Sequence, residues 1–119
     1  MGEKMKQYFE ITPTNDKDGV LQDVHWSHGS FGYFPTYALG TIYATQLYNT
    51  LKKEFSDIEK DVERGDYARI KEWLLEKVHK RGARYFAEDL MKKICGEGLN
   101  PDIYTDYLNK KYSEIYNIS

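Results

Sequence analysis

Most of this chain repeats apolar residues at every third or fourth position, the spacing of a helix that buries one face. The longest such run begins at Pro35 and continues to about Phe55. Its apolar positions lie one helical turn apart, at Leu39, Tyr43, Leu47, Leu51 and Phe55. Because proline fits the first turn of a helix, the pattern predicts one long helix that begins at Pro35.

Shorter helices are predicted wherever residues that begin or end helices flank an apolar stripe. They are expected over residues 3–9, 57–64, 66–82 and 87–95, with a helical turn at 19–26 and a last helix from Pro101. Ser56 and Glu59 have the spacing of a capping box, and Asp66 is placed to cap the next helix. The last helix has its predicted core stripe at Tyr104, Leu108, Tyr112 and Ile115.

No stretch alternates apolar and polar residues as a half-buried strand does. The sequence therefore predicts an all-α fold, a compact array of about five to six helices. At 119 residues and without an internal linker, it is expected to form a single all-α domain, residues 1–119.

A glycine- and aromatic-rich segment, residues 19–46, carries most of the candidate chemistry. His25 and His28 are three residues apart, and a protein zinc site normally needs three ligands, for which Asp23 is the nearest further candidate. The alternative is that these side chains contact or position a substrate. Tyr33 and Tyr37 follow one helical turn apart, so their hydroxyls are able to reach one spot.

The same segment resembles a known enzyme family. Five of its residues fit the pattern G-x-x-Q-D-x-H-W, and FGYFPTYALG follows soon after; the five are Gly19, Gln22, Asp23, His25 and Trp26. Together they resemble the carboxypeptidase Taq family of thermostable zinc metallocarboxypeptidases. The stretches WLLEKVHKRGARYFAEDLMKKICGEGLNP and YLNKKYSEIY are also similar to that family's C-terminal helices. The resemblance implies that the chain is the C-terminal part of a larger helical metallopeptidase.

The zinc-binding motif that the resemblance implies is missing from the chain. The family holds zinc with a His-Glu-x-x-His helix and a further glutamate, whereas the histidines here are His25, His28 and His79. We therefore expect an incomplete enzyme: a truncated or split gene product, or a deliberately expressed fragment. Alone it is expected to bind no metal or other cofactor and to be inactive.

The resemblance implies roles for seven residues of the segment. His25, Tyr33 and Tyr37 are expected to be catalytic, because imidazole and phenol donors stabilise negative charge on a carbonyl oxygen. Substrate-binding or supporting roles are expected for Gln22, Asp23, Trp26 and His28. Among these, Asp23 is expected to orient a histidine ring and Trp26 to close the wall of the cleft. The structural alternative is a packed aromatic cluster.

Composition restricts the possible partners. A net charge of −2, from 17 basic and 19 acidic residues, provides no general field for nucleic acid, and no apolar run reaches the ~18 residues of a membrane span. Cys95 is the single cysteine, which fits a reducing compartment, and the N-terminus lacks the apolar core of a signal peptide. We expect a cytoplasmic protein with no nucleic-acid or membrane partner.

Two functions remain open. In the first, the chain is part of a zinc carboxypeptidase that removes C-terminal residues from peptides, with zinc in the complete enzyme and a separate chain, or self-association, supplying the missing half. In the second, it is a non-catalytic helical interaction module derived from that family. In either case Arg81 and Arg84 are candidates to pair with a carboxylate of a partner or with the C-terminus of a peptide; the alternative is that basic residues there stabilise a helix C-terminus.

Overall fold

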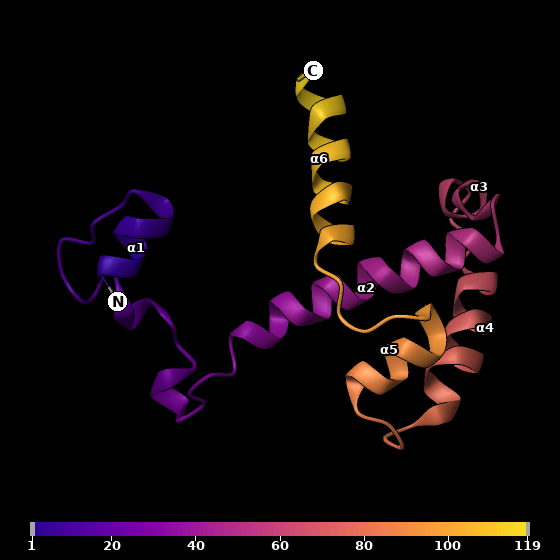
Figure 1. Cartoon of the computed structure of the whole chain (residues 1–119), viewed down its shortest axis with the longest axis horizontal. Coiled ribbons are helices and arrows are strands. Elements are labelled where there is room, and N and C mark those ends of the chain that lie inside the picture. Colours follow the sequence, from indigo (N-terminus) through magenta and orange to yellow (C-terminus); the bar gives the residue numbers. More distant parts are fainter. Residues whose placement is uncertain (1, 119) are drawn as a thin grey trace. The chain divides into compact units, whose positions relative to one another are not determined.

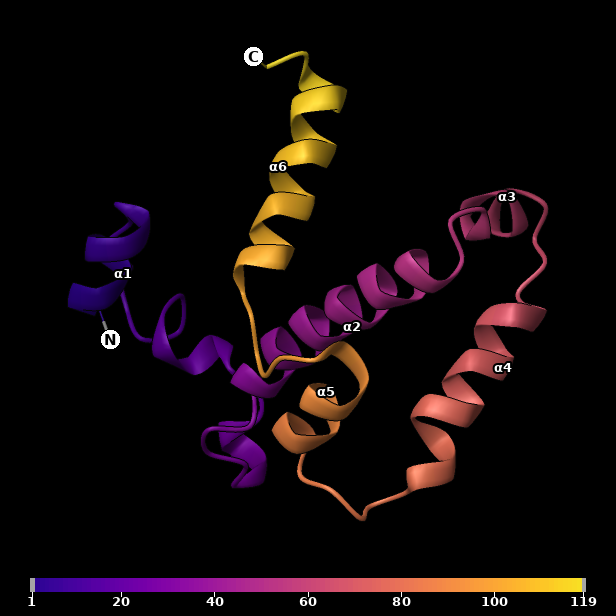
Figure 2. The same ribbon diagram turned by 45° about the vertical axis from the view of Figure 1, so that its right-hand side comes forward.

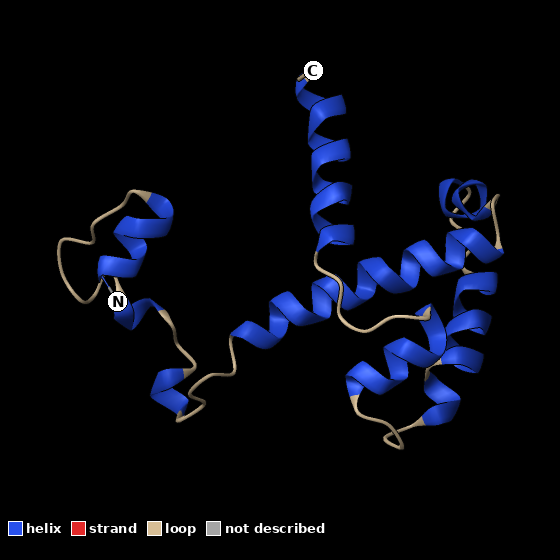
Figure 3. Ribbon diagram, in the orientation of Figure 1, coloured by secondary structure: helices blue, strands red, loops and turns tan. Residues whose placement is uncertain are grey.

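The computed structural model describes residues 2–118, and within them the only regular elements are helices (Figures 1 and 3). The α-helices are α1 (Gly2–Phe9), α2 (Pro35–Glu54), α3 (Ile58–Glu63), α4 (Ala68–Lys77), α5 (Ala87–Cys95) and α6 (Asp102–Tyr116). Single 3-10 turns are η1 (Val20–Gln22), η2 (Trp26–His28) and η3 (His79–Arg81). The all-α prediction is confirmed. No helix in the described range is long and apolar enough to cross a membrane.

The predicted boundaries are confirmed for some helices and wrong for others. Helix α2 begins at Pro35, as expected. Asp66 was expected to cap α4, but the N-cap position is Tyr67, which makes no side-chain cap; the Asp66 carboxylate accepts the N–H of the first helical residue, Ala68, at 3.0 Å. The capping box at Ser56 is wrong: α3 has no side-chain cap, and Glu59 instead accepts a hydrogen bond from Lys52 at 3.4 Å. Helix α4 is also shorter than predicted, because the chain tightens into η3 before Gly82.

The chain divides into two compact units, residues 1–38 and 39–119, and the division falls inside α2. Unit 1 contains α1, η1, η2 and the first turn of α2. None of its described residues is fully buried. Its shape therefore depends on hydrogen bonds and ring contacts between residues close in sequence.

Unit 2 has a small apolar core where α2, α3 and α4 meet. Leu51, Ile58 and Trp73 are buried there, and α3 connects the ends of the two longer helices (Figure 2). The Trp73 indole N–H donates to the Glu54 carboxylate at 2.9 Å, which satisfies the polar atom of this large side chain. Partly buried side chains surround the core: Leu47, Tyr48, Phe55, Ile70, Leu74 and Ile94.

A buried amide joins α2 to the connection between α5 and α6. Gln46 is only 1% exposed. Its side-chain nitrogen donates to the Gly98 carbonyl at 2.8 Å, and its oxygen accepts the Asn100 N–H at 3.1 Å. One side chain thus satisfies two backbone groups of a loop more than fifty positions later in the sequence.

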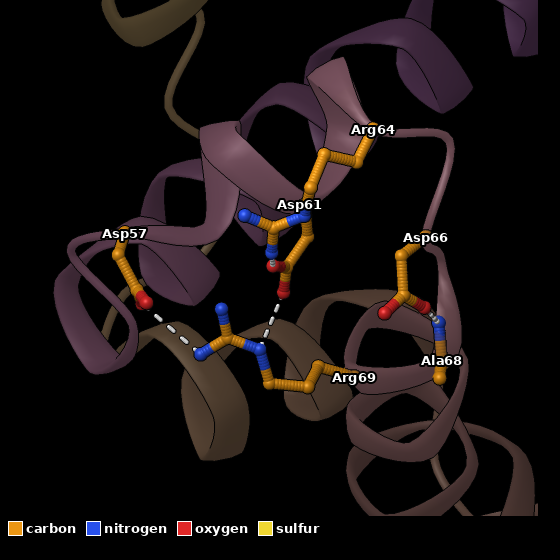
Figure 4. Close-up of polar contacts among 6 residues, drawn as sticks. All are labelled: Asp57, Asp61, Arg64, Asp66, Ala68 and Arg69. Carbon is orange, nitrogen blue, oxygen red and sulfur yellow. Dashed lines mark hydrogen bonds and ion pairs between the residues drawn. The ribbon is translucent and has the colours of Figure 1, made fainter.

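A buried carboxylate joins α3 to α4. Asp61 is 3% exposed and contacts the guanidinium groups of Arg64 and Arg69, the latter at 2.5 Å (Figure 4). Arg69 reaches Asp57 as well, at 3.0 Å. Since a buried charge is costly unless it is paired, the two arginines allow Asp61 to lie between the helices.

Helix α6 differs from the prediction in its second half. No residue of α6 is buried, and the predicted core positions Tyr112 and Ile115 are 44% and 57% exposed. Tyr104 and Leu108, nearer its start, are partly buried. The helical periodicity is confirmed, but within residues 2–118 nothing covers the end of the stripe.

Replacing Asp61 with asparagine should destabilise the fold at neutral pH. The hydrogen bond from Arg69 holds the pKa of the Asp61 carboxyl below its usual range. A carboxyl with a depressed folded-state pKa stabilises the protein above its unfolded-state pKa of about 3.9 and loses this effect as the pH falls through the folded-state value. Urea unfolding followed by circular dichroism should show the wild-type advantage at neutral pH and its loss in acid.

Glu88→Gln is the matched control, because Glu88 forms an exposed pair with Lys92 at 2.8 Å. Exposed pairs contribute little to stability, so this variant should unfold close to wild type. An Asp61→Asn protein as stable as wild type at neutral pH would contradict the role given to the buried carboxylate.

Replacing Gln46 with leucine should lower the free energy of unfolding by about 1–3 kcal/mol, because the Gly98 carbonyl and Asn100 N–H lose their partner. Thr45→Val is the control, since the Thr45 hydroxyl bonds only to the Thr41 carbonyl of its own helix. Equal stability of the two variants in thermal or urea unfolding would show that the buried amide does not hold the loop.

Candidate functional site

The segment that precedes α2 is shaped by tight backbone turns. Gly19 lies against the loop before it: a Cβ at this position would lie 3.1 Å from the Pro13 side chain and 3.3 Å from the Asn15 carbonyl. Gly29 closes η2 with φ of 75°, a conformation that glycine adopts without strain. These turns bring His25 close to the residues that begin α2.

Asp23 holds His25 at two points. One oxygen of its carboxylate accepts the backbone N–H of His25 at 3.0 Å and lies 2.7 Å from ring atom Nδ1. The side chains of Asp23 and His25 are 17% and 25% exposed, so the pair is mostly shielded from water. The Ser30 N–H also donates to the His25 carbonyl, at 2.9 Å. Both the backbone and the ring of His25 are therefore fixed.

Aromatic side chains surround the other edge of the His25 ring. Its Nε2 lies 3.4 Å from the Tyr37 hydroxyl, and its centroid lies 5.3 Å from the Tyr33 ring. Tyr33 and Tyr37 meet edge to face, with centroids 5.5 Å apart. A hydrogen bond with Tyr33 is the main cause that raises the pKa of the Tyr37 phenol. Tyr37 therefore keeps its proton at neutral pH.

The supporting residues predicted from the sequence lie farther from this group. The Gln22 amide donates to the Lys17 carbonyl at 2.6 Å, and the Trp26 ring packs against Phe31 with centroids 5.7 Å apart. His28 is exposed, and its backbone N–H donates to the His25 carbonyl at 3.2 Å. The structure thus brings together Asp23, His25, Tyr33 and Tyr37, and the catalytic and substrate-binding roles remain predictions.

Sequence reasoning missed two aromatic contributors. Phe34 lies with its ring centroid 6.2 Å from His25 and 6.4 Å from Tyr37. Phe31 packs on Trp26 and lines an open hollow of about 340 Å³. Both belong to the run FGYFPTY, and its high content of aromatic residues could have indicated that these two also join the cluster. The other residues that line the hollow are Val20, Leu21, Asp23, Val24, Trp26 and Ser27.

The described residues do not offer a metal site. Within residues 2–118 no group of three or more histidine, cysteine, aspartate or glutamate side chains is placed to hold an ion. The nearest carboxylate to His25 already contacts its Nδ1, and Nε2 lies against a phenol.

What the cluster offers chemically is a set of hydrogen-bond donors. The ring and the two phenols supply N–H and O–H groups, and Tyr33 and Tyr37 are 48% and 54% exposed, so a ligand is able to reach them. Donors fixed by their neighbours stabilise a negative oxygen better than mobile ones do, because they need not reorganise.

Comparison with known proteins places this geometry in a family. The sequence model of carboxypeptidase Taq (M32) metallopeptidase matches residues 1–112. Carboxypeptidase 1 of Bacillus subtilis is 46% identical over 114 residues, which cover 96% of this chain and 23% of the relative. Thermostable carboxypeptidase 1 of Pyrococcus furiosus is 40% identical over 110 residues, covering 92% and 22%.

Solved structures agree with the sequence matches. A structure of Pyrococcus furiosus carboxypeptidase matches with a TM-score of 0.84 and 40% identity, covering 93% of this chain and 22% of that one. Trypanosoma cruzi metallocarboxypeptidase 1 matches with a TM-score of 0.84 and 39% identity, covering 93% and 23%. The chain therefore spans less than a quarter of the length of these relatives. The resemblance seen in the G-x-x-Q-D-x-H-W pattern is confirmed, and the chain belongs to the carboxypeptidase Taq (M32) family of metallopeptidases.

Proposed function

We propose that this chain forms part of a zinc-dependent carboxypeptidase that removes amino acids from the C-termini of peptides, and that it supplies one wall of the substrate cleft. Membership of the M32 family and the carboxypeptidase names of the relatives support the reaction. The main support for a role in the substrate cleft is that Asp23, His25 and Tyr37 contact one another in sequence order. Asp23 and His25 belong to the G-x-x-Q-D-x-H-W pattern, and Tyr37 follows it.

The role proposed for this wall is to bind a developing negative charge. Peptide hydrolysis passes through a tetrahedral state in which the former carbonyl oxygen is negative, and fixed N–H and O–H donors stabilise it. His25, Tyr33 and Tyr37 provide such donors within one cluster. Asp23 keeps the imidazole in place by accepting its Nδ1–H, which is the usual function of a carboxylate behind a working histidine.

The metal of the proposed enzyme would be held by residues outside this chain. The described residues lack a suitable ligand set, so no catalytic step is assigned here to a metal. A single, partly exposed cysteine is consistent with a reducing compartment and supports the proposal of a cytoplasmic location.

A partner that covers apolar surface is part of the same proposal. In the described range, the fully buried hydrophobic residues are Leu51, Ile58, Trp73 and Met91, whereas large exposed ones occur in every α-helix except α5. Monomeric proteins rarely leave so much apolar surface open. We propose that a chain carrying the remaining part of the enzyme, or a second copy of this one, binds these faces.

Activity should appear when this chain takes the place of the matching C-terminal segment in Bacillus subtilis carboxypeptidase 1. Amino-acid release from a blocked dipeptide is the measurement. The chimera should be active, and this chain alone should be inactive with or without added zinc. In the chimera, His25→Ala or Tyr33→Phe should lower kcat by about 10²–10³, the usual cost of one oxyanion donor.

Tyr8→Phe is the matched control for Tyr33→Phe, because Tyr8 is exposed on α1 and lies outside the cluster. Circular dichroism should show that every variant keeps its helices. Zinc-dependent release by this chain alone would refute the view that its metal ligands lie elsewhere. Full activity of the His25→Ala chimera would return His25 to a packing role and favour a non-catalytic interaction module.

The isolated chain should associate or bind a hydrophobic dye. Its uncovered apolar side chains, such as Phe86 at 86% exposed, make either outcome favourable. Sedimentation velocity at several concentrations and fluorescence of an added dye are the measurements. A strict monomer that binds no dye would argue against a missing partner.

A further inference from the structure

Among the rings that surround His25, the ring of Phe34 has no polar atom. Its centroid lies 6.2 Å from the His25 ring and 6.4 Å from the Tyr37 ring, and it meets the Tyr37 ring edge to face. Separations of this size are those of aromatic rings in contact. Phe34 therefore lies directly beside two of the groups that are proposed to donate hydrogen bonds to the substrate.

The backbone fixes Phe34 at the start of α2. The Tyr37 N–H donates to the Phe34 carbonyl at 3.2 Å, and Pro35, the first residue of α2, restricts the backbone angles of the residue before it. The Phe34 side chain is nevertheless 60% exposed, more than Tyr33 at 48% or Tyr37 at 54%. A large apolar side chain is thus open to a ligand at a fixed position beside the donors.

The reaction in the proposed function determines which substrate atoms come near this ring. The oxygen that becomes negative belongs to the carbonyl group of the penultimate residue of the peptide, and fixed donors stabilise this oxygen. The side chain of that residue starts at its Cα atom, which is bonded directly to the carbonyl carbon. The Cα atom of the released amino acid lies one bond farther away, beyond the nitrogen. A carbonyl group held by the donors therefore brings the penultimate side chain nearest to them.

We propose that Phe34 determines specificity: its ring contacts the side chain of the penultimate residue and favours apolar and aromatic side chains there. The inference rests on the proposed function for the reaction and for the oxygen that is bound. Apolar surface removed from water between the ring and the substrate provides the preference. Glycine gains nothing from the ring, and a carboxylate side chain would lose water without gaining a hydrogen bond from it.

A purely structural role for Phe34 makes a different prediction. Because its ring packs on Tyr37, loss of the ring could also move the Tyr37 hydroxyl. Such a movement would lower turnover of every substrate by the same factor. A contact with a substrate side chain instead changes the ratio of kcat/KM between substrates, so the ratio separates the two roles.

The test uses the chimera with Bacillus subtilis carboxypeptidase 1 and blocked dipeptides that share a C-terminal leucine and differ in the penultimate residue. The measured quantity is kcat/KM for penultimate phenylalanine divided by kcat/KM for penultimate glycine. Phe34→Ala should lower this ratio by roughly tenfold, the size expected for loss of one apolar contact with a substrate. Its kcat/KM for the glycine substrate should stay close to wild type, which also shows that the variant is folded.

Phe9→Ala is the matched control for Phe34→Ala. Phe9 is 65% exposed at the end of α1 and lies outside the cluster, so the variant removes the same side chain at a similar exposure. The ratio between the phenylalanine and glycine substrates should be unchanged in this variant.

A second variant should create a new preference. Phe34→Lys places an ammonium group beside the penultimate side chain, so a substrate with penultimate glutamate should gain kcat/KM relative to the one with phenylalanine. A gain for one substrate cannot arise from a loss of stability. This reading therefore does not depend on how well the variant folds.

Several results would overturn the proposal. Equal losses for all substrates in Phe34→Ala would leave Phe34 only a role in packing Tyr37. A changed preference for the released amino acid, with none for the penultimate residue, would place the ring on the other side of the scissile bond. Unchanged ratios in an active chimera with Phe34→Ala and Phe34→Lys would refute this inference alone, whereas an inactive chimera without either change would overturn the proposed function and this inference together.

Discussion

Contact between α2 and α4 is the interaction on which unit 2 depends. Leu51 and Trp73 pack there with Ile58 from the intervening helix, and this small cluster is most of the apolar core. A core of this size leaves much of the positioning to buried polar groups. Gln46 fixes the connection between α5 and α6, which contributes no residue to this cluster, to α2. Asp61 adds a polar link between α3 and α4, which already meet in the cluster.

Unit 1 is organised by a different kind of force. Because none of its described residues is fully buried, apolar burial contributes little to the geometry around His25. The Asp23 carboxylate instead holds the imidazole at Nδ1, and the Ser30 N–H donates to the His25 backbone carbonyl. The ring contacts of His25 come from residues within twelve positions of it. Such a site keeps its internal geometry with few long-range contacts, and Tyr33 and Tyr37 remain 48% and 54% exposed.

The sequence predicted those features that depend on local patterns. Periodic apolar residues and Pro35 were sufficient for α2, and Asp66 was expected at the start of α4, where its carboxylate accepts the Ala68 N–H, a contact between near neighbours. The failures involve distant partners: Glu59 contacts Lys52 rather than closing a capping box, and Ile115 has helical spacing but no surface to pack against. The hydrogen bond from the Gln46 amide to the Gly98 carbonyl could not be predicted either, because nothing in the sequence around one residue identifies the other as its partner.

The same distinction explains why a chain that spans less than a quarter of its relatives' length contains the side chains of one cluster and, in its described residues, no set of metal ligands. The donor cluster lies within fifteen consecutive residues, from Asp23 to Tyr37. A short segment therefore contains both its side chains and the backbone turns that bring them together. A metal site built from separated helices cannot be inferred from a segment that lacks its ligands. Oxyanion donors and metal ligands act on the same carbonyl group, so a cleft that contains both must be completed by folding together parts that are distant in the sequence. We propose that such assembly would bury the exposed apolar side chains of α6, among them Tyr112 and Ile115.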